Sequence, residues 1–80
     1  MNKRIIITKH AKMRMSDPGR GVLTEDEVMS VLRNPDVSYF GVDGKSNVLG
    51  IAGGRRIRVC FDEDDDRILV ITVVNRGPAT

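Results

Sequence analysis

The segment from Gly53 to Val74 constrains the fold most, because it has the pattern of a β-hairpin. Residues of its first half alternate between two faces, an apolar one with Ile57, Val59 and Phe61 and a second one with Arg56, Arg58 and Cys60. Its second half is apolar on both faces, which is typical of a strand inside a sheet. We therefore expect a sheet built around this hairpin, with helices on the Ile57 face and the arginines on an open face.

Two helices are expected before the hairpin. The β-branched run Arg4–Thr8 predicts a strand, and Thr8 is suited to cap a short helix over Lys9–Met15. The turn-forming residues Ser16–Gly21 end that helix. Further along, Thr24 and Glu27 have the spacing of a capping box, and Leu23 and Val28 have that of a hydrophobic staple. The second helix is expected to end before Pro35, which disfavours helical geometry at the residue preceding it.

After Pro35 the sequence pattern predicts four strands, at Val37–Val42, Asn47–Ala52, Arg56–Asp62 and Arg67–Val74. Turn signals separate them, including Asp43-Gly44 and Gly53-Gly54. The expected order is β-α-α-β-β-β-β in a single domain over residues 1–80. Such an order indicates the α+β class, with two N-terminal helices packed on an antiparallel sheet.

Size and composition indicate how the domain is stabilised and in which compartment it is expected. A chain of 80 residues with one cysteine has a marginal core and no internal disulfide, so packing, homo-oligomerisation or a partner chain must stabilise it. The lone cysteine suits a reducing compartment. The opening apolar run is too short for a signal peptide, and no stretch is long enough to span a membrane. We expect a cytoplasmic protein.

His10 is the candidate for acid–base chemistry, because it is the only histidine of the chain. Arg14 lies one turn further along the same expected helix face. A base beside a cation is what phosphodiester cleavage without a metal needs, with arginine stabilising the negative charge of the phosphorane. The alternative is that His10 packs locally at the helix start and Arg14 is a solvated residue.

Basic and aromatic residues indicate a candidate nucleic-acid surface. Arg55, Arg56 and Arg58 can bind phosphates bidentately, and Tyr39 can stack on a base. Lys9 and Lys12 add positive charge on the first helix. The alternative is an ordinary charged strand face, partly paired with acidic residues of the same chain.

Metal and cofactor sites are not expected. The acidic run Asp62–Asp66 lacks the interior glycine and distal glutamate of a calcium loop and suits a solvated hairpin tip. Gly44-Lys45-Ser46 matches the end of a P-loop, but the required earlier glycine is Tyr39 and no helix follows. An inert packed thiol is the expectation for Cys60.

Four short motifs, in this order, resemble a known family: His10-Ala11-x-x-Arg14-Met15, Leu32-Arg33-Asn34-Pro35-Asp36, Arg58-Val59 and Ile71-Thr72-Val73. They are similar to the small domains catalogued as domain of unknown function 4258, over about Ile6 to Val74. The resemblance extends to the RelE/ParE/BrnT group of toxins and implies an mRNA-cleaving toxin with an antitoxin protein as partner. His10, Arg14 and Arg58 occupy recurrent positions of the family.

The leading hypothesis is a RelE-like toxin-type domain, a metal-independent ribonuclease with His10 as acid or base. Arg14 and Arg58 would stabilise phosphate charge, and the remaining basic residues would bind the RNA backbone. Two alternatives stay open: a non-enzymatic protein-interaction domain and a nucleic-acid-binding domain without catalysis. The enzyme hypothesis requires His10, Arg14 and Arg58 to converge on one concave surface.

Overall fold

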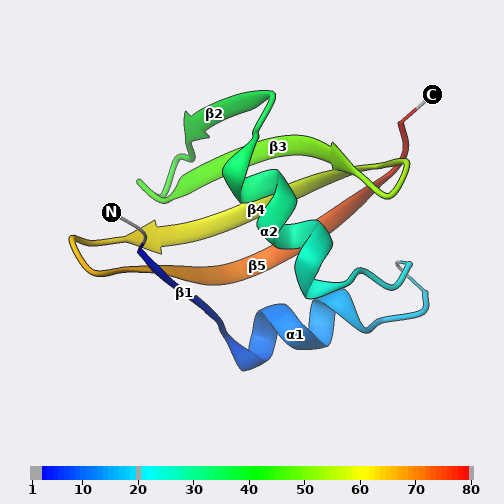
Figure 1. Cartoon of the computed structure of the whole chain (residues 1–80), viewed down its shortest axis with the longest axis horizontal. Coiled ribbons are helices and arrows are strands. Elements are labelled where there is room, and N and C mark those ends of the chain that lie inside the picture. Colours follow the sequence, from blue (N-terminus) through cyan, green and yellow to red (C-terminus); the bar gives the residue numbers. More distant parts are fainter. Residues whose placement is uncertain (1–2, 20, 80) are drawn as a thin grey trace.

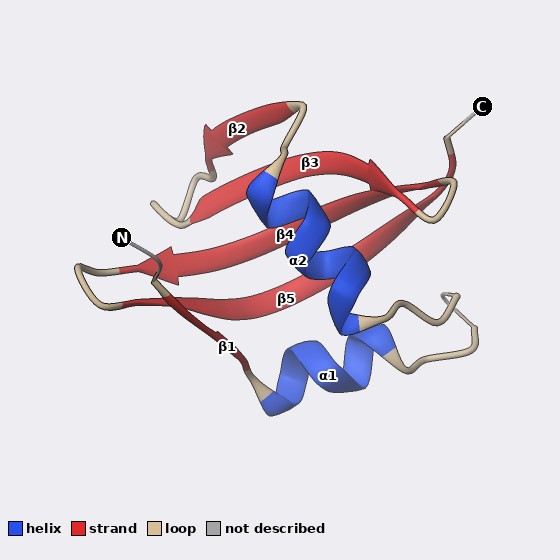
Figure 2. Cartoon of the chain, in the orientation of Figure 1, coloured by secondary structure: helices blue, strands red, loops and turns tan. Residues whose placement is uncertain are grey.

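The fold is α+β, as expected from the order of the elements. A computed structural model describes residues 3–19 and 21–79. The elements are β1 (Arg4–Ile7), α1 (Lys9–Met15), α2 (Glu25–Arg33), β2 (Val37–Phe40), β3 (Ser46–Ala52), β4 (Arg55–Glu63) and β5 (Arg67–Pro78). Figures 1 and 2 show α2 crossing one face of the sheet and α1 beside it, next to β5.

The strands form one five-stranded sheet in the order β1-β5-β4-β3-β2. Strands β2 to β5 make the expected antiparallel meander. The expectation of a wholly antiparallel sheet is wrong at β1, which pairs parallel with β5, with Ile5 opposite Ile68. No hairpin turn joins β1 to its neighbour, so no local geometry sets their relative direction. The helices between β1 and β2 carry the chain to the far edge of the sheet.

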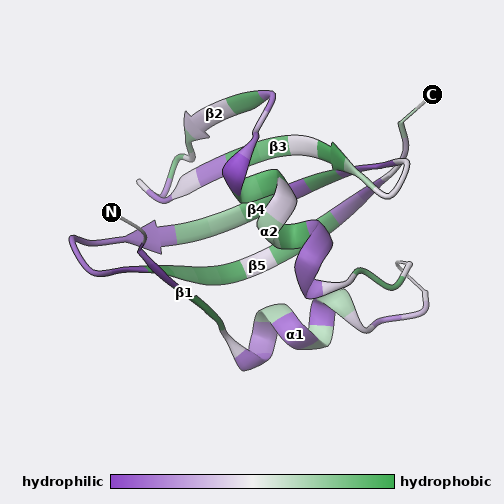
Figure 3. Cartoon of the chain, in the orientation of Figure 1, coloured by the Kyte–Doolittle hydropathy of each residue, from purple (hydrophilic) through white to green (hydrophobic). Residues whose placement is uncertain are grey.

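The core lies between the sheet and the two helices. Ile57 and Val59 are fully buried and Phe61 is nearly so, which confirms the apolar face predicted for this strand. The other buried core residues are Ala11, Met15, Leu23, Val28, Val31, Val48, Val70 and Val73. Figure 3 shows the hydrophobic stretches along the middle of the central strands.

A β-bulge sets the register of β5. Cys60 pairs with Thr72, whereas the next residue, Phe61, pairs with Val70. One extra residue, Ile71, is thus accommodated in β5. Because of this extra residue, Val70 and Val73 both face the core although they are three positions apart.

The local signals of α1 and α2 are confirmed. Thr8 caps α1 by accepting from the backbone N–H of Ala11 at 3.2 Å, and its hydroxyl donates to the carbonyl of Val70 at 2.8 Å. The capping box of α2 is complete. Gly50 of β3 explains how α2 approaches the sheet, since a Cβ there would lie 3.1 Å from a methyl carbon of Val31. In the described residues, no helix is long and apolar enough to cross a membrane.

Candidate functional site

Arg58 is held in place on the open face of the sheet, the face that α2 does not cover. Its Nη1 donates to Oδ1 of Asn47 at 3.2 Å, and Nδ2 of Asn47 donates to the carbonyl of Lys45 at 3.1 Å. Asn47 is only 3% exposed. Since a buried amide with partners on both ends has little freedom, Asn47 fixes the direction of the guanidinium.

A hollow of about 280 Å³ lies beside this guanidinium. Tyr39 and Thr72 line it together with Arg58 and Asn47, and the turn after β2 closes one side. Tyr39 is 40% exposed, so its ring is accessible. Cys60 also lines the hollow, but burial raises the pKa of its thiol. A raised pKa keeps the sulfur protonated near neutral pH, so Cys60 is not an activated nucleophile.

Arg56 lies further along the same face. It is exposed and lines a second hollow, of about 400 Å³, with Leu49, Ile51 and Arg76. Arg56 and Arg58 share one face of β4, and the buried Ile57 between them points to the other, helix-covered face. This confirms the face predicted for both arginines. The open face thus combines cations with apolar side chains.

Arg55 has a different surrounding, on the helix side of the sheet. Its Nη2 donates to both carboxylate oxygens of Glu27, at 3.0 and 2.8 Å, and its Nη1 donates to the carbonyl of Val22 at 2.7 Å. The backbone N–H of Thr24 and the Arg55 guanidinium lower the pKa of Glu27. Arg55 therefore links β4 to the start of α2, and we do not include it in the candidate interface.

The candidate residues of α1 lie apart from the hollow beside Arg58. Lys9, His10 and Lys12 are exposed and Arg14 is half-buried, while Ala11 and Met15 of the same helix are buried in the core. The hollow beside Arg58 is lined by β2 to β5 and the turn after β2, and α1 contributes nothing to it. The structure thus places His10 and Arg14 together and Arg58 on another surface. Arg20, a further basic residue of this region, lies outside the described residues.

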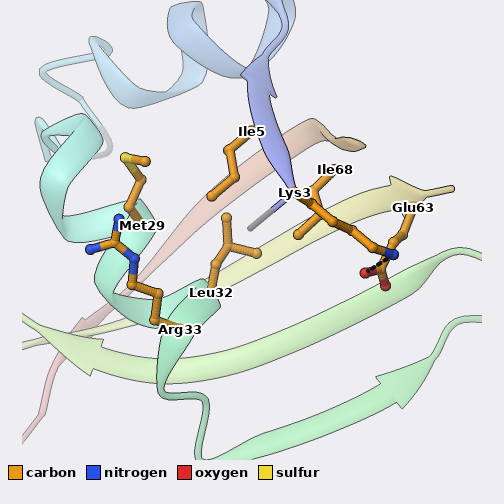
Figure 4. A pocket seen from close by; sticks show the side chains of 7 residues that line it. All are labelled: Lys3, Ile5, Met29, Leu32, Arg33, Glu63 and Ile68. Carbon is orange, nitrogen blue, oxygen red and sulfur yellow. Dashed lines mark hydrogen bonds and ion pairs between the residues drawn. The ribbon is translucent and has the colours of Figure 1, made fainter. Parts of the chain in front are cut away.

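A groove that sequence reasoning missed lies between α2 and the start of β1 and β5 (Figure 4). It measures about 550 Å³, and its walls include Ile5, Leu32 and Ile68. Lys3 donates to Glu63 at 2.8 Å on one side, and the exposed Arg33 lies on the other. Residues from three distant segments form this groove, so no local sequence pattern could have indicated it.

The acidic tip after β4 has a structural explanation. Oδ1 of Asp64 accepts from the backbone N–H groups of Asp66 and Arg67, both at 2.9 Å. Asp64 thereby stabilises the turn between β4 and β5, and these contacts lower the pKa of its carboxyl. Among residues 3–19 and 21–79, no group of three or more His, Cys, Asp or Glu side chains is placed to hold a metal ion.

The fold and the candidate surfaces define a small α+β domain with helices on one sheet face and a basic, partly apolar open face. The family model described as "Domain of unknown function (DUF4258)" matches residues 7–75. The chain belongs to this family. No curated protein and no solved structure matches the chain.

Proposed function

We propose that the open sheet face binds single-stranded RNA, with Arg58 contacting a phosphate and Tyr39 stacking on a neighbouring base. The observation that supports this proposal is the fixed Arg58 guanidinium beside an accessible aromatic ring in one hollow. A guanidinium forms paired hydrogen bonds to phosphate oxygens, and an aromatic ring stacks on any base. Arg56 extends the positive charge along the face, and Lys9 and Lys12 of α1 would hold flanking backbone.

Replacing Arg58 by alanine is expected to weaken RNA binding about tenfold, which is the effect of losing one charge-assisted phosphate contact. The measurement is fluorescence anisotropy with a labelled uridine oligonucleotide at fixed salt. Arg58→Lys should restore only part of the affinity, since lysine keeps the charge but lacks the fork. Arg4→Ala removes an equal charge from the exposed start of β1 and serves as the control. Equal affinities of Arg58→Ala and Arg4→Ala would refute the assignment.

We further propose that the domain acts as a RelE-like toxin. It would cleave bound mRNA without a metal, with His10 as acid or base. His10 and Arg14 lie on α1 and Arg58 lies on the open face, so the three do not line the single hollow that the enzyme hypothesis requires. Cleavage would therefore need RNA that reaches both surfaces or a shift of α1 on binding. Incubation of the protein with mRNA in EDTA should then give cleavage that His10→Ala abolishes. Unchanged cleavage by His10→Ala would exclude the role of His10. If the native protein binds the RNA but leaves it intact, the domain binds RNA without cleaving it.

The groove of Figure 4 favours a second candidate function, binding of an acidic protein such as an antitoxin. The groove combines the apolar side chains of Ile5, Leu32 and Ile68 with charged residues, a combination that suits an amphipathic helix. The guanidinium of Arg33 makes no hydrogen bond or ion pair with the described residues.

Binding of an acidic amphipathic helix to the groove can be tested with a synthetic peptide of leucine and glutamate at helical spacing. Such a peptide should shift the NMR signals of Ile5, Leu32 and Ile68, because these side chains line the groove. Arg33→Glu should abolish the shifts by charge repulsion, and a leucine–lysine peptide is the matched control. Equal shifts with both peptides would contradict the proposed charge preference.

A further inference from the structure

Strand β2 is an unprotected edge of the sheet. It is the last strand in the sheet order, and all its residues are exposed. Figure 1 shows it at the upper border, with no described element beyond it. Phe40 is 78% exposed, and Val42, just after the strand, is fully exposed. Residues 37–42 include no charged side chain. Edge strands normally carry charges or proline that prevent pairing, as Arg4 does at the start of β1, the opposite edge.

The register shows which backbone groups of β2 are free to pair. The N–H of Gly41 donates to the carbonyl of Lys45 at 2.9 Å, and Tyr39 pairs with Asn47. In an antiparallel ladder, every second residue directs its N–H and C=O toward the neighbouring strand. Tyr39 therefore bonds to β3, whereas Ser38 and Phe40 direct their backbone groups outward.

We propose that two copies of this chain pair through β2 in antiparallel fashion about a two-fold axis at Tyr39. In this register, Ser38 of each copy exchanges N–H···O bonds with Phe40 of the other, so the outward groups of both residues are satisfied. Tyr39 faces Tyr39 of the second copy on the open face. The two sheets become one continuous sheet, and the hollows beside Arg58 lie on the same side of it.

Charge and symmetry favour a second copy over another strand. A two-fold contact uses the same patch on both molecules, so the patch must be complementary to itself. In the proposed register Asp36 falls near Val42 of the second copy, and no two acidic residues face each other. The exposed apolar side chains of β2 gain cover on both faces of the sheet. A small domain with a marginal core also gains stability by burying such surface.

Solution mass tests the proposal. Light scattering after size exclusion should give twice the mass of the chain for the native protein. Phe40→Lys and Ser38→Pro should give monomers, since the first adds charge to the edge and the second removes an outward N–H and introduces a ring at the contact. Val22→Lys, at an equally apolar residue that is 54% exposed, and Ser38→Thr should remain dimeric. A monomeric native protein at all concentrations, or dimeric Phe40→Lys, would overturn the proposal.

A disulfide crosslink tests the register and does not depend on the edge variants. Directly opposite residues of a non-hydrogen-bonded pair have Cα atoms about 4.5 Å apart, within disulfide range. Tyr39→Cys should therefore give a covalent dimer under mild oxidation. Ile51→Cys on the same face and the native chain with buried Cys60 should not. Absence of the Tyr39→Cys crosslink would exclude this register.

The dimer and the RNA proposal can fail separately. Arg58→Ala should remain dimeric while it loses RNA affinity, and Phe40→Lys should become monomeric while its single hollow still binds RNA.

Discussion

Replacing Ile57 by alanine is expected to lower the free energy of unfolding by about 3 kcal/mol, because it leaves a cavity in a close-packed core. Ile57 is fully buried in the central strand, opposite Gly50. Val31 of α2 packs over Gly50 and belongs to the same core cluster as Ile57, so the cavity would open in the core between helix and sheet. A domain of this length has a total stability of roughly 4–12 kcal/mol. The variant should therefore unfold at a much lower urea concentration.

Urea denaturation followed by circular dichroism measures this loss. Ile51→Ala is the matched control, since Ile51 is 53% exposed on the open face of the neighbouring strand. We expect it to change stability by less than about 0.5 kcal/mol. If both variants lost equal stability, the helix-covered face would not be the main core.

Replacing Glu27 by glutamine is expected to lower the free energy of unfolding by about 2 kcal/mol, because the Glu27 carboxylate accepts hydrogen bonds from two donors. One is the backbone N–H of Thr24 at 2.8 Å, and the other is the Arg55 guanidinium. Glutamine keeps an acceptor but loses the charge that pairs with Arg55. Glu25→Gln is the control, since Glu25 lies in the same first turn but is exposed. Its effect measures how much a negative charge near the helix start contributes to the free energy of unfolding through the helix dipole alone.

The effect of Glu27 should depend on pH in one direction. Its pKa is lower in the folded chain than its ordinary value, so the folded state favours the carboxylate. The resulting stability is present above the ordinary carboxyl pKa and is lost as the pH falls through the folded pKa. The difference between native protein and Glu27→Gln should therefore shrink in acid. A constant difference down to the acid transition would contradict the proposed role of the charge.

Local signals predicted the helices well. Thr24 and Glu27 marked the start of α2, and Pro35 its end, because capping and proline geometry depend on residues close in the chain. The alternation at Ile57, Val59 and Phe61 predicted the core face for the same reason. The parallel pairing of β1 and the bulge at Ile71 were not predicted, since both depend on contacts between distant strands.

The candidate site was only partly accessible to sequence reasoning. The pattern placed Arg56 and Arg58 on one face, but it treated Arg55 as equivalent to them. The structure places Arg55 against Glu27 and Val22, because it lies on the other side of the pleat. The contact between Asn47 and Arg58 joins neighbouring strands whose register could not be read from the residues alone.

The sequence by itself determined the elements of this protein and the two-sided character of β4, since periodicity and capping act over a few residues. Tertiary structure alone decided what each side faces. It placed Arg58 beside Tyr39 and away from His10, and it left β2 at an open edge. The physical reason is that side-chain proximity across a sheet depends on strand order and register, which arise from the packing of the whole chain.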